Sequence, residues 1–252
     1  MIPLKDDNPQ INIPYGTYII IILNILTWIF IQSYGSAENL NYSICKYGLI
    51  PNTLLNDLKS SNCENLNIGT YFTILSSMFM HGGWMHIIGN LLFLWVFGGN
   101  VEDSMGTFRY IIFYTLCGTF AALTQVYTDM YSIIPMVGAS GAIGGIMGAY
   151  LFLYPKVKVH ICIPMIIFFP IIKVPAFFML GYWILLQLLE GIPSIGSNSG
   201  GIAFWAHIGG YISGLILVYF FKDDELLTNH KFYGWSKSKD ISEIWNDPDN
   251  KQ

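Results

Sequence analysis

The amino-acid sequence predicts an all-α polytopic membrane protein with six transmembrane helices. Three observations lead to this fold class: the composition, a series of charge-free stretches, and an uneven distribution of Lys and Arg. Of 252 residues, 53% are hydrophobic and 11% are charged. A soluble domain carries about 25% charged residues, so this chain lacks the charges to cover a water-facing surface. The net charge of −4 gives no indication of nucleic-acid binding.

Charge-free stretches locate the six candidate spans. A spanning helix needs about 20 mostly apolar residues. With polar loop residues trimmed from their ends, the predicted spans are 15–34, 82–100, 108–127, 137–154, 175–191 and 203–221. The charge-free stretch 159–172 is too short to span and contains Pro164 and Pro170. We therefore expect an interfacial or partly re-entrant loop there.

The basic residues predict the orientation. Six spans put both termini on one side, which then holds ten of the twelve Lys and Arg residues, whereas Lys46 and Lys59 lie on the other. Because cytoplasmic loops carry an excess of Lys and Arg, we expect a multi-pass cell-membrane protein with both termini in the cytoplasm. Its parts are a cytoplasmic N-terminal segment at 1–14, a six-span domain at 15–221 with an outer loop at about 35–81, and a polar cytoplasmic tail at 222–252.

Strongly polar side chains occur within three of the predicted spans. His86 and Asn90 lie four residues apart in the second span and so share one helix face. Ser140 opens the fourth span and His207 lies near the start of the sixth. These three spans all run from outside to inside, so the polar groups lie at one depth, about one to two turns below the outer surface. Polar groups in a bilayer are costly and indicate function.

Small residues follow the serine and the second histidine on the same helix faces. They are Gly144, Gly148, Gly210 and Gly214. Faces of small residues let two helix backbones approach closely in lipid. Contact between the fourth and sixth spans through these faces is therefore expected to bring Ser140 and His207 within hydrogen-bonding distance.

This arrangement predicts nucleophilic catalysis at the outer side of the membrane. Ser140 is the candidate nucleophile and His207 its base. His86 and Asn90, with the backbone N–H of the serine, are candidate donors to an oxyanion. No acidic residue lies at the depth needed to orient His207, so the sequence indicates a dyad. His81, near the outer surface, is a candidate supporting group.

The motifs resemble those of the rhomboid family of intramembrane serine proteases. The similarity rests on His-x-x-x-Asn at 86–90, Gly-x-Ser-Gly at 138–141 and Ala-His-x-x-Gly-x-x-x-Gly at 206–214, in that order. The end of the second span, Gly-Gly-Asn-Val-Glu at 98–102, also resembles the family. The resemblance covers roughly residues 1–221 and implies a six-helix rhomboid-like bundle.

The resemblance implies an intramembrane serine endopeptidase that cleaves transmembrane protein substrates near the outer end of their helix. It assigns Ser140 as the nucleophile, His207 as the general base, and His86 and Asn90 as oxyanion donors. It also implies that Glu102 ties the end of the second span to the first loop. Besides these substrates and the lipid bilayer it implies no partner, and it implies no metal and no cofactor. The oligomeric state is not indicated.

The sequence also departs from the family pattern. Some members stack a Tyr, one turn after the serine, on the catalytic histidine, and here that position is Gly144. The Trp-Arg pair of some first loops is not evident. We therefore expect the orientation of the histidine and the gating of substrates to differ from those members.

Other functions remain open at this stage. His86 and His207 are also candidate axial ligands of a haem. A proton-coupled carrier would need intramembrane acids, but Glu190 lies only at a span end. A catalytically silent rhomboid-like binding protein would be expected to lack the serine or the histidine. In the outer loop, Cys45 and Cys63 leave a disulfide open in an oxidising exterior.

Overall fold

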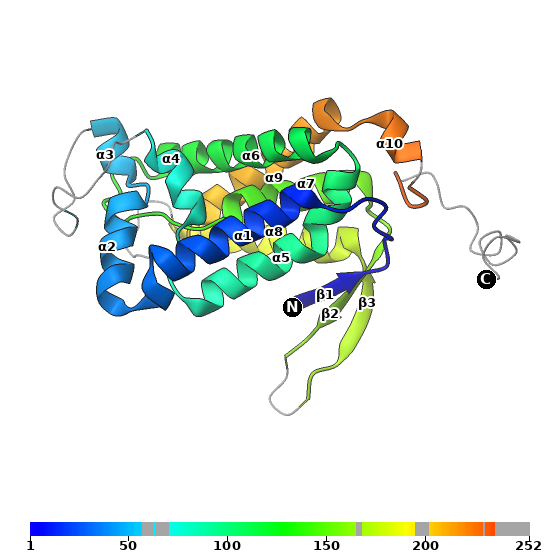
Figure 1. The fold of residues 1–252 in the computed structure, drawn as a ribbon, viewed down its shortest axis with the longest axis horizontal. Coiled ribbons are helices and arrows are strands. Elements are labelled where there is room, and N and C mark those ends of the chain that lie inside the picture. The colour runs from blue at the N-terminus through cyan, green and yellow to red at the C-terminus, as the bar shows by residue number, and fades with distance from the viewer. Residues whose placement is uncertain (57–62, 64–70, 165–167, 195–201, 229, 235–252) are drawn as a thin grey trace, which may run out of the picture.

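The structure is a computed structural model that describes residues 1–56, 63, 71–164, 168–194, 202–228 and 230–234. Among the described residues, six apolar helices form the body of the molecule (Figure 1). They are α1 (Tyr15–Phe30), α5 (Trp84–Asp103), α6 (Thr107–Thr128), α7 (Ser140–Leu153), α8 (Ala176–Ser194) and α9 (Phe204–Phe221). Each overlaps one predicted span, and the prediction of a helical polytopic membrane protein is confirmed.

Length separates these helices into two groups. Four of them, α5, α6, α8 and α9, are long and apolar enough to cross a membrane, whereas α1 and α7 have 16 and 14 residues. The count of six spans therefore stays a prediction. Large apolar side chains on the outside of the bundle are exposed, among them Trp95 (61%), Phe178 (62%) and Phe220 (72%). Lipid is a favourable environment for these apolar side chains. The helices also satisfy their own backbone hydrogen-bonding groups there.

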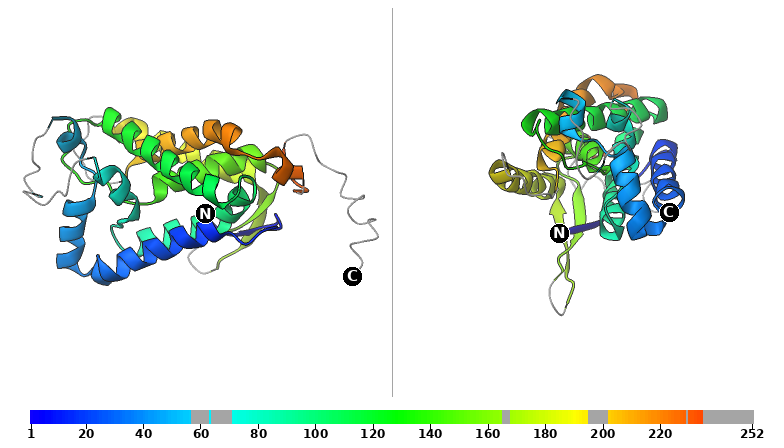
Figure 2. Two further views of the ribbon diagram at one scale, coloured as in Figure 1. Left: turned by 45° about the horizontal axis from the view of Figure 1, so that its top comes forward. Right: turned by 90° about the vertical axis from the view of Figure 1, so that its left-hand side faces the viewer.

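Helix α7 lies in the middle of the bundle, between α5, α6 and α9 (Figures 1 and 2). Its residues from 141 to 150 are all buried. A Cβ atom on Gly210 would lie 1.9 Å from the carbonyl oxygen of Gly141, and one on Gly214 would lie 1.9 Å from that of Gly145. The backbones of α7 and α9 are thus in direct contact, as close as glycine alone permits.

This contact predicts the effect of adding one methyl group. Gly214→Ala is expected to lower the free energy of unfolding in detergent by roughly 1–3 kcal/mol, the usual cost of overpacking, because the new Cβ must push α9 away from α7. The matched control is Gly181→Ala in α8, where a Cβ would meet no atom within 4 Å. Equal stability of the two variants would contradict the close packing.

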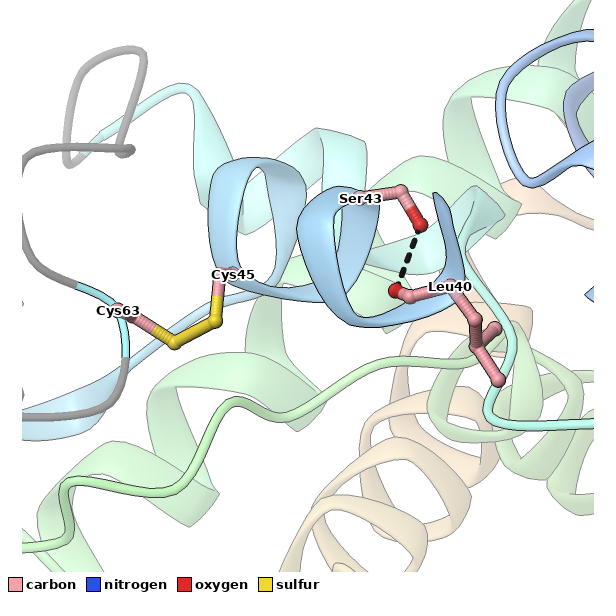
Figure 3. Close-up of a disulfide and its surroundings, with 4 residues drawn as sticks. All are labelled: Leu40, Ser43, Cys45 and Cys63. Atoms are coloured by element: carbon pink, nitrogen blue, oxygen red, sulfur yellow. Dashed lines mark hydrogen bonds between the residues drawn. A yellow bond between two sulfur atoms is a disulfide. The ribbon is translucent and has the colours of Figure 1, made fainter. Parts of the chain in front are cut away.

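The segment before α5 covers one end of the bundle. It contains η1 (Ser33–Gly35), α2 (Ala37–Tyr47), α3 (Pro51–Asn56), α4 (Thr73–Ser76) and η2 (Ser77–Phe79). Cys45 in α2 forms a disulfide with Cys63, with Cα atoms 5.1 Å apart, close to Ser43, whose hydroxyl donates to the Leu40 carbonyl (Figure 3). The pairing that the sequence left open is therefore present.

A three-stranded antiparallel sheet lies at the opposite end of the bundle, where α10 (Asp224–Thr228) also lies (Figure 1). Its order is β1 (Ile2–Asp6), β2 (Lys158–Cys162) and β3 (Ile171–Pro175). The stretch 159–172, expected as an interfacial or partly re-entrant loop, therefore contributes to two strands, and the expectation of a loop is wrong for 159–162 and 171–172. Val159 and Ile161 are buried and alternate with the less buried Lys158, His160 and Cys162, which is the alternation of a strand. The N-terminal segment at 1–14 contributes β1 to this sheet.

Glu102 joins α5 to the start of α1 at this same end. Its carboxylate accepts hydrogen bonds from the backbone N–H groups of Gly16 and Thr17, both at 2.8 Å, and from the Thr107 hydroxyl at 2.6 Å. The first N–H groups of a helix lack intrahelical partners and favour a negative charge. The expectation that Glu102 ties α5 to the first loop is therefore wrong, and its contacts lie at the end away from that loop.

Asp6 in β1 is a second acidic group near this end. Burial raises its pKa from 3.8 to about 6, although hydrogen bonds from the Tyr150 hydroxyl, the Asn8 N–H and the Asn100 amide act in the opposite direction. Between pH 3.8 and 6 the folded chain thus holds a proton that the unfolded chain has released. This contribution to stability is complete below pH 3.8 and is lost as the pH rises through 6.

Asp6 is accordingly expected to make the melting temperature fall as the pH rises from about 4 to 7. Thermal unfolding in detergent across this range checks the expectation. Asp6→Asn should remove this component, because the amide does not titrate. The same pH slope in wild type and Asp6→Asn would show that Asp6 is not its source.

Candidate active site

Ser140 and His207 meet at the end of the bundle that carries α2 and α3. Ser140 is the first residue of α7 and His207 lies in the first turn of α9. The serine Oγ lies 2.8 Å from the histidine Nε2. The close approach of the two helices explains this distance. A Cβ atom added to Gly144, one turn after the serine, would lie only 3.0 Å from the His207 carbonyl oxygen.

Two side chains of α8 hold the other side of the His207 ring. The Gln187 Oε1 lies 2.7 Å from the histidine Nδ1, and the centroid of the Trp183 ring lies 5.6 Å from that of the imidazole. Neither residue is predicted as part of the site from the sequence. A lone amide in an apolar helix belongs to no motif, and only the four-residue spacing of Trp183 and Gln187 places them on one face.

His86 lies beside Gly138, which is two residues before Ser140. Its Nδ1 accepts a hydrogen bond from the Gly82 N–H at 3.2 Å, so a neutral His86 carries its proton on Nε2. A Cβ atom on Gly138 would lie 2.6 Å from that Nε2, and the φ of Gly138 is +127°. Glycine is therefore required here both for space and for its conformation.

Further N–H donors belong to residues that line the same cavity as the serine. The Nδ2 of Asn90 is buried and has no hydrogen-bond partner in the described part of the chain. Buried polar groups are normally paired, so an unpaired one needs an explanation. Ser140 begins α7, and the N–H groups of a first helical turn have no partner within the helix. Together with the His86 Nε2, these donors are suited to stabilise a negative charge that develops near the serine.

One cavity of about 710 Å³ is lined by four polar residues: His86, Asn90, Ser140 and His207. This volume lies in the range of ordinary ligand sites, about 300–1,000 Å³. Apolar side chains form much of the remaining wall: Met85, Phe93, Met136, Val137, Ile143, Met147, Trp183 and Ile202.

His81 packs against His86, and the two rings make an edge-to-face contact with their centroids 5.1 Å apart. The Gln32 side chain holds the backbone of His81 through its N–H and its carbonyl, at 2.9 and 2.8 Å. Burial, followed by the proximity of His86, lowers the pKa of His81 to about 3. His81 is therefore neutral near pH 7 and supports the His86 ring.

The described residues also show how side chains that ligate metals are placed. Within the described residues, no group of three or more His, Cys, Asp or Glu side chains is placed to hold a metal ion. Both ring nitrogens of His207 are in hydrogen bonds, to Gln187 and to Ser140. Ligation of a haem iron by His207 would require the ring to give up one of these hydrogen bonds.

Comparison with known proteins places this region in a family. A family model described as a Rhomboid domain matches residues 69–223, which contain all four polar residues of the cavity. Rhomboid protease AarA of Providencia stuartii is 30% identical over 177 residues, 64% of this chain and 59% of that protein. Rhomboid protease GluP of Bacillus subtilis is 29% identical over 139 residues, 55% of this chain and 24% of that protein.

A mitochondrial relative gives a similar result. Rhomboid protein 1, mitochondrial, of Saccharomyces cerevisiae is 27% identical over 180 residues, 67% of this chain and 42% of that protein. The chain thus spans between about a quarter and three fifths of the length of these three relatives.

Proposed function

Because this chain belongs to the rhomboid family, we propose that it is an intramembrane serine endopeptidase that cleaves membrane-spanning protein substrates. The observation that carries the proposal is the distance of 2.8 Å between the Ser140 Oγ and the His207 Nε2, at the wall of a cavity large enough for a peptide segment. A hydroxyl adjacent to an imidazole is the arrangement of an activated nucleophile.

In the proposed mechanism, the Ser140 Oγ attacks a peptide carbonyl carbon while its proton passes to the His207 Nε2. The tetrahedral intermediate collapses when the C–N bond breaks, and the imidazolium gives its proton to the leaving amine. An acyl-enzyme remains on the serine. Water then attacks the ester carbon, loses a proton to the imidazole and releases the acid, while the serine regains its proton.

The oxyanion of each tetrahedral intermediate needs donors fixed in advance. The His86 Nε2, the Asn90 Nδ2 and the backbone N–H of Ser140 are the proposed donors. The support for this role is that Gly82 fixes the protonated nitrogen of His86 and that the buried Asn90 amide has an unpaired donor. Donors of this kind stabilise the transition state most in a site that excludes bulk water.

The substrate proposed for this site is a transmembrane helix that unwinds locally near its outer end. Unwinding is needed because the carbonyl groups of a helix already accept hydrogen bonds. The enzyme is proposed to lie in the cell membrane with both termini in the cytoplasm and the cavity opening to the outside. The Lys and Arg distribution supports this orientation. The Cys45–Cys63 disulfide, at the end of the bundle that carries the cavity, supports it independently because disulfides persist in oxidising compartments.

Cleavage of a model single-span substrate in proteoliposomes tests the proposal. Wild-type protein is expected to release the product, and Ser140→Ala is expected to release none above background. Ser132→Ala is the matched control, since that hydroxyl lies in the loop before α7 and accepts a hydrogen bond from the Ile134 N–H. Equal cleavage by Ser140→Ala and wild type would refute the proposed function.

A further inference from the structure

We propose that Gln187 is a positioning residue that selects the tautomer of His207 needed for general-base catalysis. The inference rests on the proposed function and goes beyond the dyad by adding a neutral third group. Gln187 lies in α8 and faces the side of the imidazole opposite to Ser140, with its Oε1 2.7 Å from the Nδ1. The Nε2 on the other side of the ring is 2.8 Å from the serine Oγ.

A second hydrogen bond fixes which end of the Gln187 amide faces the ring. The Gln187 Nε2 donates to the backbone carbonyl of Trp183, one turn earlier in α8, at 3.3 Å. The amide oxygen is therefore the atom that faces His207. Since this oxygen only accepts hydrogen bonds, the Nδ1 must carry the proton.

The tautomer follows directly from this orientation. A neutral imidazole holds one proton, so a protonated Nδ1 leaves the Nε2 with a free lone pair that faces the Ser140 hydroxyl. This is the form that removes a proton from the serine. An amide turned the other way would present N–H to the Nδ1, move the ring proton to the Nε2 and block proton transfer.

The amide performs this role without a buried negative charge. A carboxylate at this position would be costly in an apolar bundle, whereas the amide oxygen still strengthens its hydrogen bond when the imidazolium forms. Trp183 restrains the ring from α8, because its own ring packs against both His207 and Tyr211 of α9, with centroid distances of 5.6 and 6.0 Å. His86 of α5 is a titratable group that lines the same cavity as His207.

The experiment measures kcat, KM and the pH profile of cleavage in proteoliposomes. Gln187→Leu is expected to lower kcat roughly tenfold to hundredfold, part of the 10²–10⁴-fold that a positioned base contributes, with little change in KM. Gln187→Glu is expected to restore much of kcat and to move the acid limb of the profile to higher pH, because a carboxylate stabilises the imidazolium. Leu189→Ala, exposed two residues further along α8, should match wild type.

A spectroscopic readout covers the case in which Gln187→Leu folds poorly. The ¹⁵N resonances of the His207 ring are expected to report a protonated Nδ1 and an unprotonated Nε2 in wild type, and a mixture of tautomers in Gln187→Leu. The inference is overturned if wild-type His207 carries its proton on Nε2, or if Gln187→Leu keeps wild-type kcat. If either result is found and Ser140→Ala does not cleave, the role of Gln187 is refuted but the proposed function is not. If Ser140→Ala cleaves, the proposed function itself is refuted.

Discussion

Replacement of His207 by alanine is expected to lower kcat for substrate cleavage by about 10²–10⁴-fold, the contribution of a positioned general base. The imidazole Nε2, at 2.8 Å from the Ser140 Oγ, is the acceptor for the proton that the hydroxyl must lose. The KM should change little, because the His207 ring contacts the Ser140 hydroxyl and is not proposed to bind the substrate. Initial rates of cleavage over a range of substrate concentrations in proteoliposomes separate the two constants.

The control for this prediction is His160→Ala. His160 lies in β2, at the opposite end of the bundle, and is paired with Asp7 at 2.6 Å. Its removal should leave kcat at the wild-type level. If His207→Ala and His160→Ala cleave at the same rate, His207 does not act as the base.

Loss of a single oxyanion donor is expected to have the second-largest effect. His86→Ala and Asn90→Ala should each raise the activation free energy by about 2.7–4 kcal/mol, which lowers kcat roughly 10²–10³-fold. Because both donors act on the same developing charge, the double variant should lose less than the sum of the two single losses. Steady-state rates of the three variants form a double-mutant cycle that measures this coupling.

The matched control lies between these two residues. Ile88 is two residues from each of them on α5 and is exposed away from the cavity, so Ile88→Ala should keep wild-type kcat. A loss confined to KM in His86→Ala and Asn90→Ala would contradict the oxyanion role, because it would indicate equal binding of ground state and transition state.

The helical bundle and the packing of its centre follow from local sequence patterns. The stretches 137–154 and 203–221 predict α7 and α9 within a few residues, since length and lack of charge are properties of each segment alone. The glycines that follow Ser140 and His207 predict the close approach of the two helices, because a small side chain limits the distance between backbones wherever the helices lie.

Other parts depend on contacts that no single segment reveals. β1 pairs with β2 across more than 150 residues of chain, and five-residue strands beside Pro164 and Pro170 resemble a loop when they are considered alone. Glu102 binds the start of α1, 86 residues away for Gly16, rather than the nearby outer loop. The role of Gln187 depends on the rotation of α8 about its axis, which tertiary packing sets.

We propose that Ser140 is a nucleophile activated by His207. This role can be tested by treating the purified protein with a fluorophosphonate, which reacts with activated serines, and locating the adduct by mass spectrometry of peptides. The expected result is one adduct, on Ser140, formed much more slowly in His207→Ala. An adduct on a different serine, or no adduct in protein that still cleaves substrate, would contradict the claim.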